Sequence, residues 1–245
     1  MSPHEQAIPR SWLFVPGHDP ARLDAALASG AEAIVVDLEE FTPAAERDSA
    51  CQAFPAFAER CRQQNCRPMA RINRLDRSGA AELEALIKGA PSAIFLPQVE
   101  NPQALIDLSQ TLDDVERRYG LSPEQVGIVP TLESRLAIDN ANALLQVPRL
   151  AAALIGTGDL AQDLAQSLGL STAEAVSRLR PYRQRFLEAC HCAGLLAIDG
   201  PWPMSEGFID DQAWAIRQGF RARCVTDPAQ IPFLHDALSA QLQTE

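Results

Sequence analysis

The sequence predicts a single-domain (β/α)₈ TIM barrel, in which eight parallel strands, each followed by a helix, close into a ring. Three observations lead to this prediction. Short apolar runs recur eight times, segments with a helical spacing of apolar residues separate them, and 245 residues suit one such domain. An open doubly wound sheet is the alternative, but no G-x-G-x-x-G follows a predicted strand and no G-x-x-x-x-G-K-[ST] occurs.

The eight apolar runs lack a clean alternation with polar residues, which is typical of parallel strands covered by helices. They lie at residues 12–15, 33–37, 69–73, 93–97, 127–131, 152–156, 195–199 and 222–226.

Helical patterns such as "ARLDAALASG", "GAAELEALIKGA" and "SRLAIDNANALLQV" fill the gaps between these runs. Gly30, Gly89 and Gly219 each follow a helical pattern and predict a helix end. No linker or low-complexity segment divides the chain, so residues 1–245 are predicted to form one domain.

The charge of the chain argues against two classes of partner. A net charge of −11 repels phosphate backbones, so we expect no nucleic-acid binding. No apolar stretch reaches 18 residues, so we expect no membrane span. The first ten residues lack the pattern of a signal peptide, and we expect a cytoplasmic protein with reduced cysteines.

Barrel enzymes carry their chemistry where the strands end, so the residues that follow each predicted strand are the candidates. General loop polarity accounts for one or two of them, but poorly for an arginine inside residues 69–73. In chain order, the candidates are Pro16-Gly17-His18; Asp37, Glu39 and Glu40; Arg71 and Asn73; Pro97-Gln98; Glu133; Gly156-Thr157-Gly158-Asp159; Asp199-Gly200; and Thr226-Asp227.

Glu133 and Asp159 form a candidate metal site. They follow the fifth and sixth strands, and adjacent strands lie ~4.8 Å apart, so the two carboxylates can share one cation. Two oxygen ligands with several waters describe a magnesium site. The alternatives are a pair of solvated loop acids, or an N-cap role for Asp159.

Arg71 is a candidate for binding a substrate carboxylate, because a guanidinium can hold one with two parallel hydrogen bonds. An α-keto acid would then lie between the arginine and the metal, and a metal on an enolate oxygen stabilises the charge that develops as a C–C bond breaks. The alternative is an internal ion pair with Asp37 or Glu39.

Other chemistries lack the residues that they need. The single lysine, Lys88, precedes the fourth strand and lies far from a Schiff-base position. No G-x-S-x-G occurs, and His18 is the one histidine beside a strand end. Cys190, His191 and Cys192 lie in a helical pattern, where ordinary packing is favoured over metal binding.

Eight short stretches resemble, in order, the motifs of the HpcH/HpaI aldolase and citrate lyase family, most closely its citrate lyase β-subunit-like branch. The resemblance covers about residues 10–236. The stretches are "RSWLFVPG", "AIVVDLEE", "RINRLD", "FLPQVE", "VPTLES", "GTGDLAQDL", "AIDGPW" and "DPAQIP".

This resemblance implies a modified (β/α)₈ barrel, assembled as a homotrimer or hexamer, that makes or breaks C–C bonds through an enolate or oxo acid bound to Mg²⁺ or Mn²⁺. It implies metal ligation by Glu133 and Asp159 and catalytic roles for Arg71, Asp37 and Glu40, with Glu40 as acid or base. In the pyruvate-aldolase branch a histidine matches Glu40. The implied substrate-binding residues are Arg71, Glu133, Arg10, Gly158 and Asp199.

Two positions depart from the family pattern: Gln98 replaces a lysine, and Thr226-Asp227-Pro228 replaces "IHP". The chain also ends soon after the eighth helical pattern, so thioester hydrolysis, which in relatives accompanies a C-terminal lid, is not expected. The favoured activity is a Mg²⁺-dependent C–C lyase acting on a citryl- or malyl-type coenzyme A thioester. The alternatives are a class II pyruvate-type aldolase acting on a free 4-hydroxy-2-oxo acid, and a weakly active or non-catalytic barrel subunit of a larger lyase complex.

Overall fold

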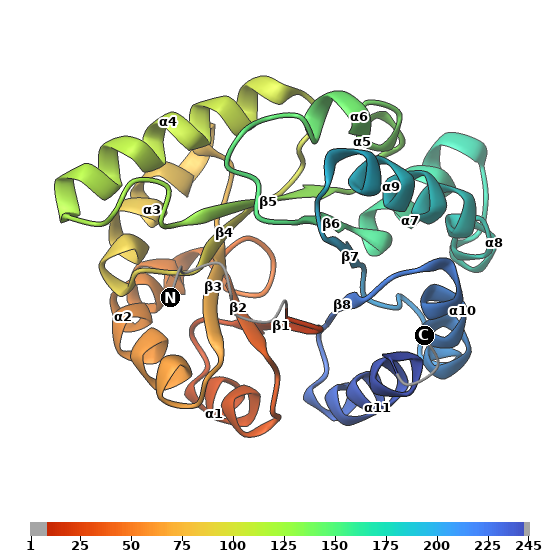
Figure 1. The fold of residues 1–245 in the computed structure, drawn as a ribbon, viewed down its shortest axis with the longest axis horizontal. Coiled ribbons are helices and arrows are strands. Elements are labelled where there is room, and N and C mark those ends of the chain that lie inside the picture. The colour runs from red at the N-terminus through yellow and green to blue at the C-terminus, as the bar shows by residue number, and fades with distance from the viewer. Residues whose placement is uncertain (1–8, 243–245) are drawn as a thin grey trace.

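Eight parallel strands follow one another around a closed barrel in the computed structural model, which describes residues 9–242 (Figure 1). The barrel closes because β1 pairs with both β2 and β8. The predicted fold class is therefore confirmed, with strand ends that differ from the predicted ones by up to two residues. The strands are β1 (Ser11–Pro16), β2 (Ala33–Asp37), β3 (Arg67–Arg71), β4 (Ala93–Leu96), β5 (Gly127–Leu132), β6 (Ala153–Ile155), β7 (Ala197–Asp199) and β8 (Ala222–Val225).

Helices surround the barrel, and none within residues 9–242 combines the length and apolar character that crossing a membrane requires. The α-helices are α1 (Pro20–Ala28), α2 (Arg47–Gln63), α3 (Ala80–Leu86), α4 (Pro102–Tyr119), α5 (Arg135–Asp139), α6 (Ala141–Leu144), α7 (Thr157–Leu168), α8 (Thr172–Ser177), α9 (Leu179–Ala193), α10 (Phe208–Gln218) and α11 (Ile231–Leu242). Shorter helical turns are η2 (Ala44–Glu46), η3 (Leu75–Gly79), η4 (Ile87–Gly89) and η5 (Pro228–Gln230).

Local sequence signals set several helix ends. Asn101 accepts a hydrogen bond from the Ala104 amide at the start of α4, and Gly120 ends that helix in the left-handed region. Gly30 and Gly219 are also left-handed, as their predicted helix ends require. At the third predicted end the left-handed residue is Ala90, with a φ of +43°. Gly89 instead allows close packing, since an added Cβ would lie 2.7 Å from Phe54.

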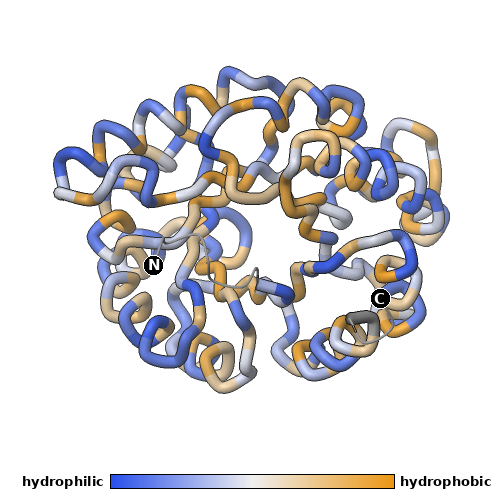
Figure 2. Tube along the Cα trace, in the orientation of Figure 1, coloured by the Kyte–Doolittle hydropathy of each residue, from blue (hydrophilic) through white to orange (hydrophobic). Residues whose placement is uncertain are grey.

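Side chains alternate between the barrel interior and the helix layer along every strand. Figure 2 shows apolar residues concentrated along the strands, while the helices mix apolar and polar residues. A larger apolar core lies between strands and helices. A separate cluster fills the barrel: Trp12, Phe14, Ala33, Val35, Met69, Ala93, Phe95, Val129, Ala152, Leu154, Ile198, Ala222 and Cys224.

Two charged strand residues point outward, into the helix layer. Asp199 on β7 and Arg223 on β8 are out of phase with the inward-facing Ile198 and Cys224. Asp199 accepts two hydrogen bonds from Arg183 of α9, at 2.9 and 2.5 Å. Arg183 and Arg223 both bind Asp211 of α10, each at 2.6 Å. The four side chains, which we call the outer charge cluster, are at most 2% exposed and join β7 and β8 to α9 and α10.

Without Arg183, two buried carboxylates share the single cation Arg223, so one negative charge is unbalanced, and we expect Arg183→Met to lower the free energy of unfolding by about 3–5 kcal/mol. Urea denaturation measures this change. The matched control is Arg185→Met on the same helix, since Arg185 pairs with Asp139 and both side chains are more than half exposed. It is expected to lower the free energy by about 0–1 kcal/mol. Equal losses in the two variants would contradict the assigned role of the cluster.

Candidate functional site

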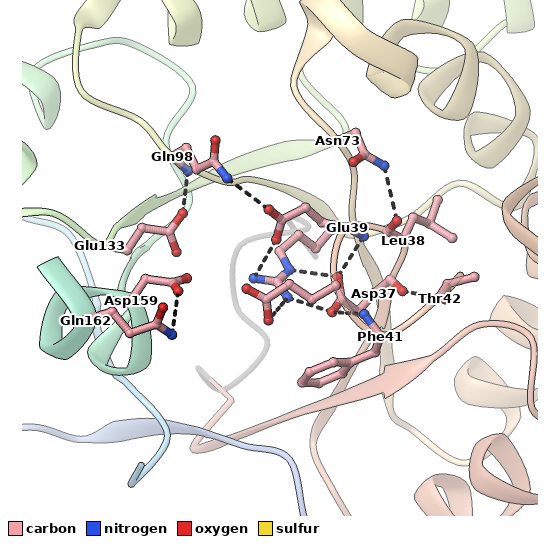
Figure 3. Close-up of polar contacts among 12 residues, drawn as sticks. Asp37, Leu38, Glu39, Phe41, Thr42, Asn73, Gln98, Glu133, Asp159 and Gln162 are labelled. Atoms are coloured by element: carbon pink, nitrogen blue, oxygen red, sulfur yellow. Dashed lines mark hydrogen bonds and ion pairs between the residues drawn. The ribbon is translucent and has the colours of Figure 1, made fainter. Parts of the chain in front are cut away.

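A buried ion pair lies at the C-terminal mouth of the barrel. Asp37 and Arg71 are register partners at the ends of β2 and β3, and both point inward. Arg71 donates through Nε and Nη2 to the two carboxylate oxygens of Asp37, at 2.7 and 2.6 Å. The amides of Glu39 and Phe41 also donate to Asp37 (Figure 3). The internal ion pair that the sequence left open is therefore present, and Asp37 fixes the plane of the Arg71 guanidinium.

The outer edge of Arg71 faces two further carboxylates. Its Nη1 lies 3.1 Å from Glu39, and its Nη2 lies 3.2 Å from Glu40. The rings of Phe14 and Phe41 lie 5.3 and 5.9 Å from the guanidinium carbon. The ion pair with Asp37 outweighs burial and holds the pKa of Arg71 above its ordinary value. The Glu40 side chain is 44% exposed, so solvent reaches this edge of the guanidinium.

Glu133 follows β5 and points into the same mouth, where it is 7% exposed. Its Oε1 accepts a hydrogen bond of 2.6 Å from the backbone amide of Gln98. Gln98 has a φ of +55°, a left-handed conformation that directs this amide to Glu133. Gly156 makes room on the other side, because an added Cβ would lie 2.5 Å from the Glu133 Cβ.

Asp159 lies in the first turn of α7, and Figure 3 shows its carboxylate and that of Glu133 directed toward the same space. The N-cap alternative for Asp159 is wrong, because Gly156 occupies the cap position. Burial and the Asp159 carboxylate raise the pKa of Glu133 to about 8. Burial also raises the pKa of Glu39 above its ordinary value, and nearby carboxylates add to the rise although Arg71 opposes it. The carboxylates gathered around Arg71 therefore outnumber that guanidinium.

This donor set fits a hard divalent cation. Within residues 9–242, no three His, Cys, Asp or Glu side chains are grouped so that all could hold one metal ion. Glu133 and Asp159 would therefore supply two oxygens, and water or substrate the rest, which is the way in which Mg²⁺ is commonly bound. Cys190 is buried in α9 whereas Cys192 is exposed, in keeping with the expected helix packing.

Three predicted substrate-binding residues have different placements. Gly158 lies directly before Asp159, and a Cβ added to it would meet no atom within 4 Å. Arg10 precedes β1, at the opposite end of the barrel, where it binds Glu32 at 2.6 Å and Ser239 of α11 at 2.9 Å. The structure does not bring Arg10 to the site.

Asp199 does not enter the site either. It was assigned to the rim because it ends an apolar run, but it points outward and is fully buried among the arginines of the outer charge cluster. Both residues are therefore left out of the proposed site.

Two residues, Phe14 and Gln98, make contacts at the site that the sequence did not indicate. Phe14 lies in an apolar run, which predicts a core residue, but its ring lies against the guanidinium of Arg71. Gln98 stood out as a departure, but the structure adds that its side-chain amide donates to Glu39 at 3.2 Å, so Gln98 links Glu39 to Glu133. Its left-handed backbone could not be read from the residue type.

A cavity of about 310 Å³ opens beside Arg71 at the same mouth. Phe14 and Phe41 separate it from the ion pair, and Arg22 supplies a cation in its wall. A larger apolar groove of about 750 Å³ lies between α10 and α11 and contains none of the candidate site residues. Of the two, the smaller cavity is the one that borders the Arg71 ion pair, through Phe14 and Phe41. Its lining residues are Phe14, Val15, Pro16, Arg22, Ala25, Phe41, Thr226 and Pro228.

Comparison with known proteins agrees with the predicted resemblance. The citrate lyase β subunit of Escherichia coli strain K12 is 28% identical over 240 residues, which span 96% of this chain and 78% of that protein. A (3S)-malyl-CoA thioesterase of Cereibacter sphaeroides is 28% identical, over 96% of this chain and 79% of its own length.

Solved structures show the same fold. A Mycobacterium tuberculosis citrate lyase β subunit, complexed with oxaloacetate and magnesium, superposes with a TM-score of 0.74 at 24% identity, covering 95% of this chain and 97% of that one. A citrate lyase from Burkholderia xenovorans LB400 gives 0.80 at 16% identity, covering 95% of this chain and 78% of that one.

The family model described as HpcH/HpaI aldolase/citrate lyase matches residues 10–228. This match spans most of the chain, and the protein is an enzyme of the aldolase/citrate lyase type. The chain therefore belongs to the HpcH/HpaI aldolase/citrate lyase family.

Proposed function

We propose that the protein is a magnesium-dependent carbon–carbon lyase that cleaves a citryl- or malyl-type coenzyme A thioester. The observation that carries the proposal is the pair Glu133 and Asp159, whose carboxylates are directed at one space. The Arg71 guanidinium is near enough to oppose the rise in the pKa of Glu133. The names of the relatives, a citrate lyase subunit and a malyl-CoA thioesterase, support this class of substrate.

Glu133 and Asp159 would hold Mg²⁺ or Mn²⁺. When bound, the cation stabilises negative charge that develops on substrate oxygens. The chain prepares this site through the Gln98 amide, which orients Glu133, and through Gly156, which lets the Glu133 side chain pass.

Arg71 would bind the carboxylate of the oxo-acid half of the substrate. Asp37 holds its Nε and Nη2 edge, so the guanidinium stays in one plane. A substrate carboxylate can then replace Glu39 and Glu40 on the outer edge, with the same charge-assisted geometry.

Glu40 is the proposed acid and base, because it is exposed and borders the carboxylate-binding edge. In cleavage it takes the proton of the substrate hydroxyl as the C–C bond breaks and the hydroxyl carbon becomes a carbonyl carbon, a ketone from a citryl substrate or an aldehyde from a malyl substrate. The electron pair of the broken bond passes to the thioester half, whose carbon then accepts a proton. The products are an oxo acid and a shorter acyl thioester.

The cavity beside Phe14 and Phe41 favours a thioester over a small free oxo acid. It extends away from the metal carboxylates, and its apolar walls suit a pantetheine arm. Arg22 offers a cation to the phosphates of coenzyme A.

Methyl-proton exchange in heavy water, followed by NMR with Mg²⁺ present, tests the proposal. Pyruvate and acetyl-coenzyme A are tested separately, the latter with and without oxaloacetate or glyoxylate. Exchange at acetyl-coenzyme A supports the thioester lyase. Exchange at pyruvate alone would favour an aldolase acting on a free oxo acid instead, and no exchange at either, with Mg²⁺ bound, would favour a subunit without activity of its own.

Removing one proposed metal ligand should abolish cation binding. We expect Glu133→Gln to weaken Mg²⁺ binding by about 100-fold or more, because only one carboxylate then remains, while the fold is retained. Isothermal titration calorimetry measures the affinity, and circular dichroism checks the fold. Glu188→Gln on the exposed face of α9 is the control and should bind Mg²⁺ like the wild type. Unchanged affinity in Glu133→Gln would refute the assigned site.

The affinity for Mg²⁺ should depend steeply on pH. The pKa of Glu133 is about 8 in the metal-free protein, and the cation must displace its proton. Affinity should therefore rise about tenfold per pH unit below pH 8 and level off above it. Because the folded-state pKa is raised, the metal-free protein should lose stability as the pH rises from about 4.5 through 8, and Glu133→Gln should remove this loss. A flat affinity profile between pH 6 and 8 would contradict the assignment.

Arg71→Lys keeps the charge but loses the planar pair of donors. A charge-assisted bidentate contact contributes about 2–3 kcal/mol, so oxaloacetate should bind tens-fold more weakly while Mg²⁺ affinity stays nearly unchanged. Titration with oxaloacetate in saturating Mg²⁺ measures the effect. Arg74→Lys is the control, because Arg74 pairs with Asp76 in an exposed loop. The carboxylate-binding role is excluded if both variants bind oxaloacetate like the wild type.

A further inference from the structure

The position of the Asp159 carboxylate depends on the placement of the first turn of α7, in which Asp159 lies. Its carboxylate accepts a long hydrogen bond, 3.4 Å, from Gln162 on the same helix. No hydrogen bond ties that carboxylate to another element in the part of the chain that the structure describes. Whatever fixes the first turn of α7 therefore fixes the direction of this proposed metal ligand.

Thr157 fixes that first turn. The N-cap residue, Gly156, has no side chain to cap the helix, so the helix start depends on other contacts. Thr157 is the first residue of α7 and is 2% exposed. Its hydroxyl donates a hydrogen bond to the carbonyl of Pro201, in the segment between β7 and α10. The contact thus ties α7 to a neighbouring segment 44 residues away in the chain.

The Pro201 segment is itself held by the outer charge cluster. The Gly200 amide donates to Asp199 at 3.0 Å, and the Gly200 carbonyl accepts from Nε of Arg223 at 3.1 Å. Gly200 also permits the close approach, because an added Cβ would lie 2.5 Å from the Thr157 hydroxyl. Thr157 therefore bonds to the Pro201 segment, which the buried ion pairs of the outer charge cluster hold in place.

The same turn also contacts the second proposed metal ligand. Gly156, directly before Thr157, packs against the Glu133 side chain so closely that an added Cβ would lie 2.7 Å from its Oε2. The Gly156 amide donates to the carbonyl of Leu132, the residue before Glu133, at 2.9 Å. One turn thus lies between Glu133 on one side and Pro201 on the other.

We propose that Thr157 is a positioning residue that sets the placement of Asp159 relative to Glu133, and through it the affinity for the divalent cation. This inference rests on the metal site in the proposed function. The hydroxyl acts by bracing the turn against Pro201, and it contacts neither the cation nor the substrate.

The test compares two substitutions at this position. Thr157→Val keeps the shape and removes the donor, whereas Thr157→Ser keeps the donor. Supporting contacts of this kind change metal affinity by about 10–100-fold, so Thr157→Val should weaken Mg²⁺ binding at least tenfold, with Thr157→Ser within about twofold of the wild type. Calorimetry with MgCl₂, far below the melting temperature, gives the affinity. Thr157→Ala serves the same purpose if the valine variant does not fold.

A purely structural role predicts a different result. Ser171→Ala removes the capping box of α8, which lies beyond the far end of α7. It should lower the melting temperature in EDTA but leave Mg²⁺ affinity unchanged. If Thr157→Val behaves like Ser171→Ala, with wild-type affinity, the inference is overturned while the metal site stands. If the wild type binds no Mg²⁺, or Glu133→Gln binds it normally, the proposed metal site fails and the inference fails with it.

Discussion

The strict alternation of side chains along eight closed parallel strands is the constraint on which the rest of this structure depends. Only every second residue of a strand points into the barrel, so a shift of one position moves a charged side chain from the mouth to the helix layer. Asp37 and Arg71 end their strands on inward positions, and Glu133 continues the inward series of β5. Asp199 and Arg223 fall on outward positions of β7 and β8. The same residue types therefore build two buried charge groups with different roles.

These two groups differ in charge balance. The balanced group joins strands to helices, whereas the unbalanced group forms the candidate site. The outer charge cluster contains two arginines and two aspartates, so its positive and negative charges are equal in number and each is paired. The group at the mouth places the carboxylates of Asp37, Glu39, Glu40, Glu133 and Asp159 around one guanidinium. Burying unbalanced carboxylates is costly, and the raised pKa values of Glu133 and Glu39 express that cost. A divalent cation removes the imbalance, which is a physical reason for metal dependence that does not rest on any relative.

Much of the fold could be predicted from the sequence, because apolar runs and helical patterns follow directly from burial. The acids at the mouth could be predicted as candidates for the same reason, since charges at the ends of apolar runs are unusual. The direction of each side chain could not be predicted. In a barrel covered by helices both faces of a strand are apolar, so the sequence around Asp199 gives no sign of which face it occupies. Arg10 lies in a motif of the family, but the motif does not say that its side chain binds Glu32.

Gln98, which replaces a lysine of the family motif, affects the charge balance of the candidate site. Its backbone amide donates to Glu133 and its side-chain amide donates to Glu39, so it joins the proposed metal ligand to the edge of Arg71 that is proposed to bind a carboxylate. The related motif has lysine at this position, and an ammonium there would offset one carboxylate. A neutral amide keeps the hydrogen bonding but leaves the negative charge in place. Gln98 also holds a left-handed backbone, which costs about 1–3 kcal/mol in a residue other than glycine, and the hydrogen bond to the buried Glu133 carboxylate helps to offset that cost. The backbone at this position thus maintains the geometry of Glu133, while the neutral side chain leaves the negative charge of the mouth for the proposed cation to balance.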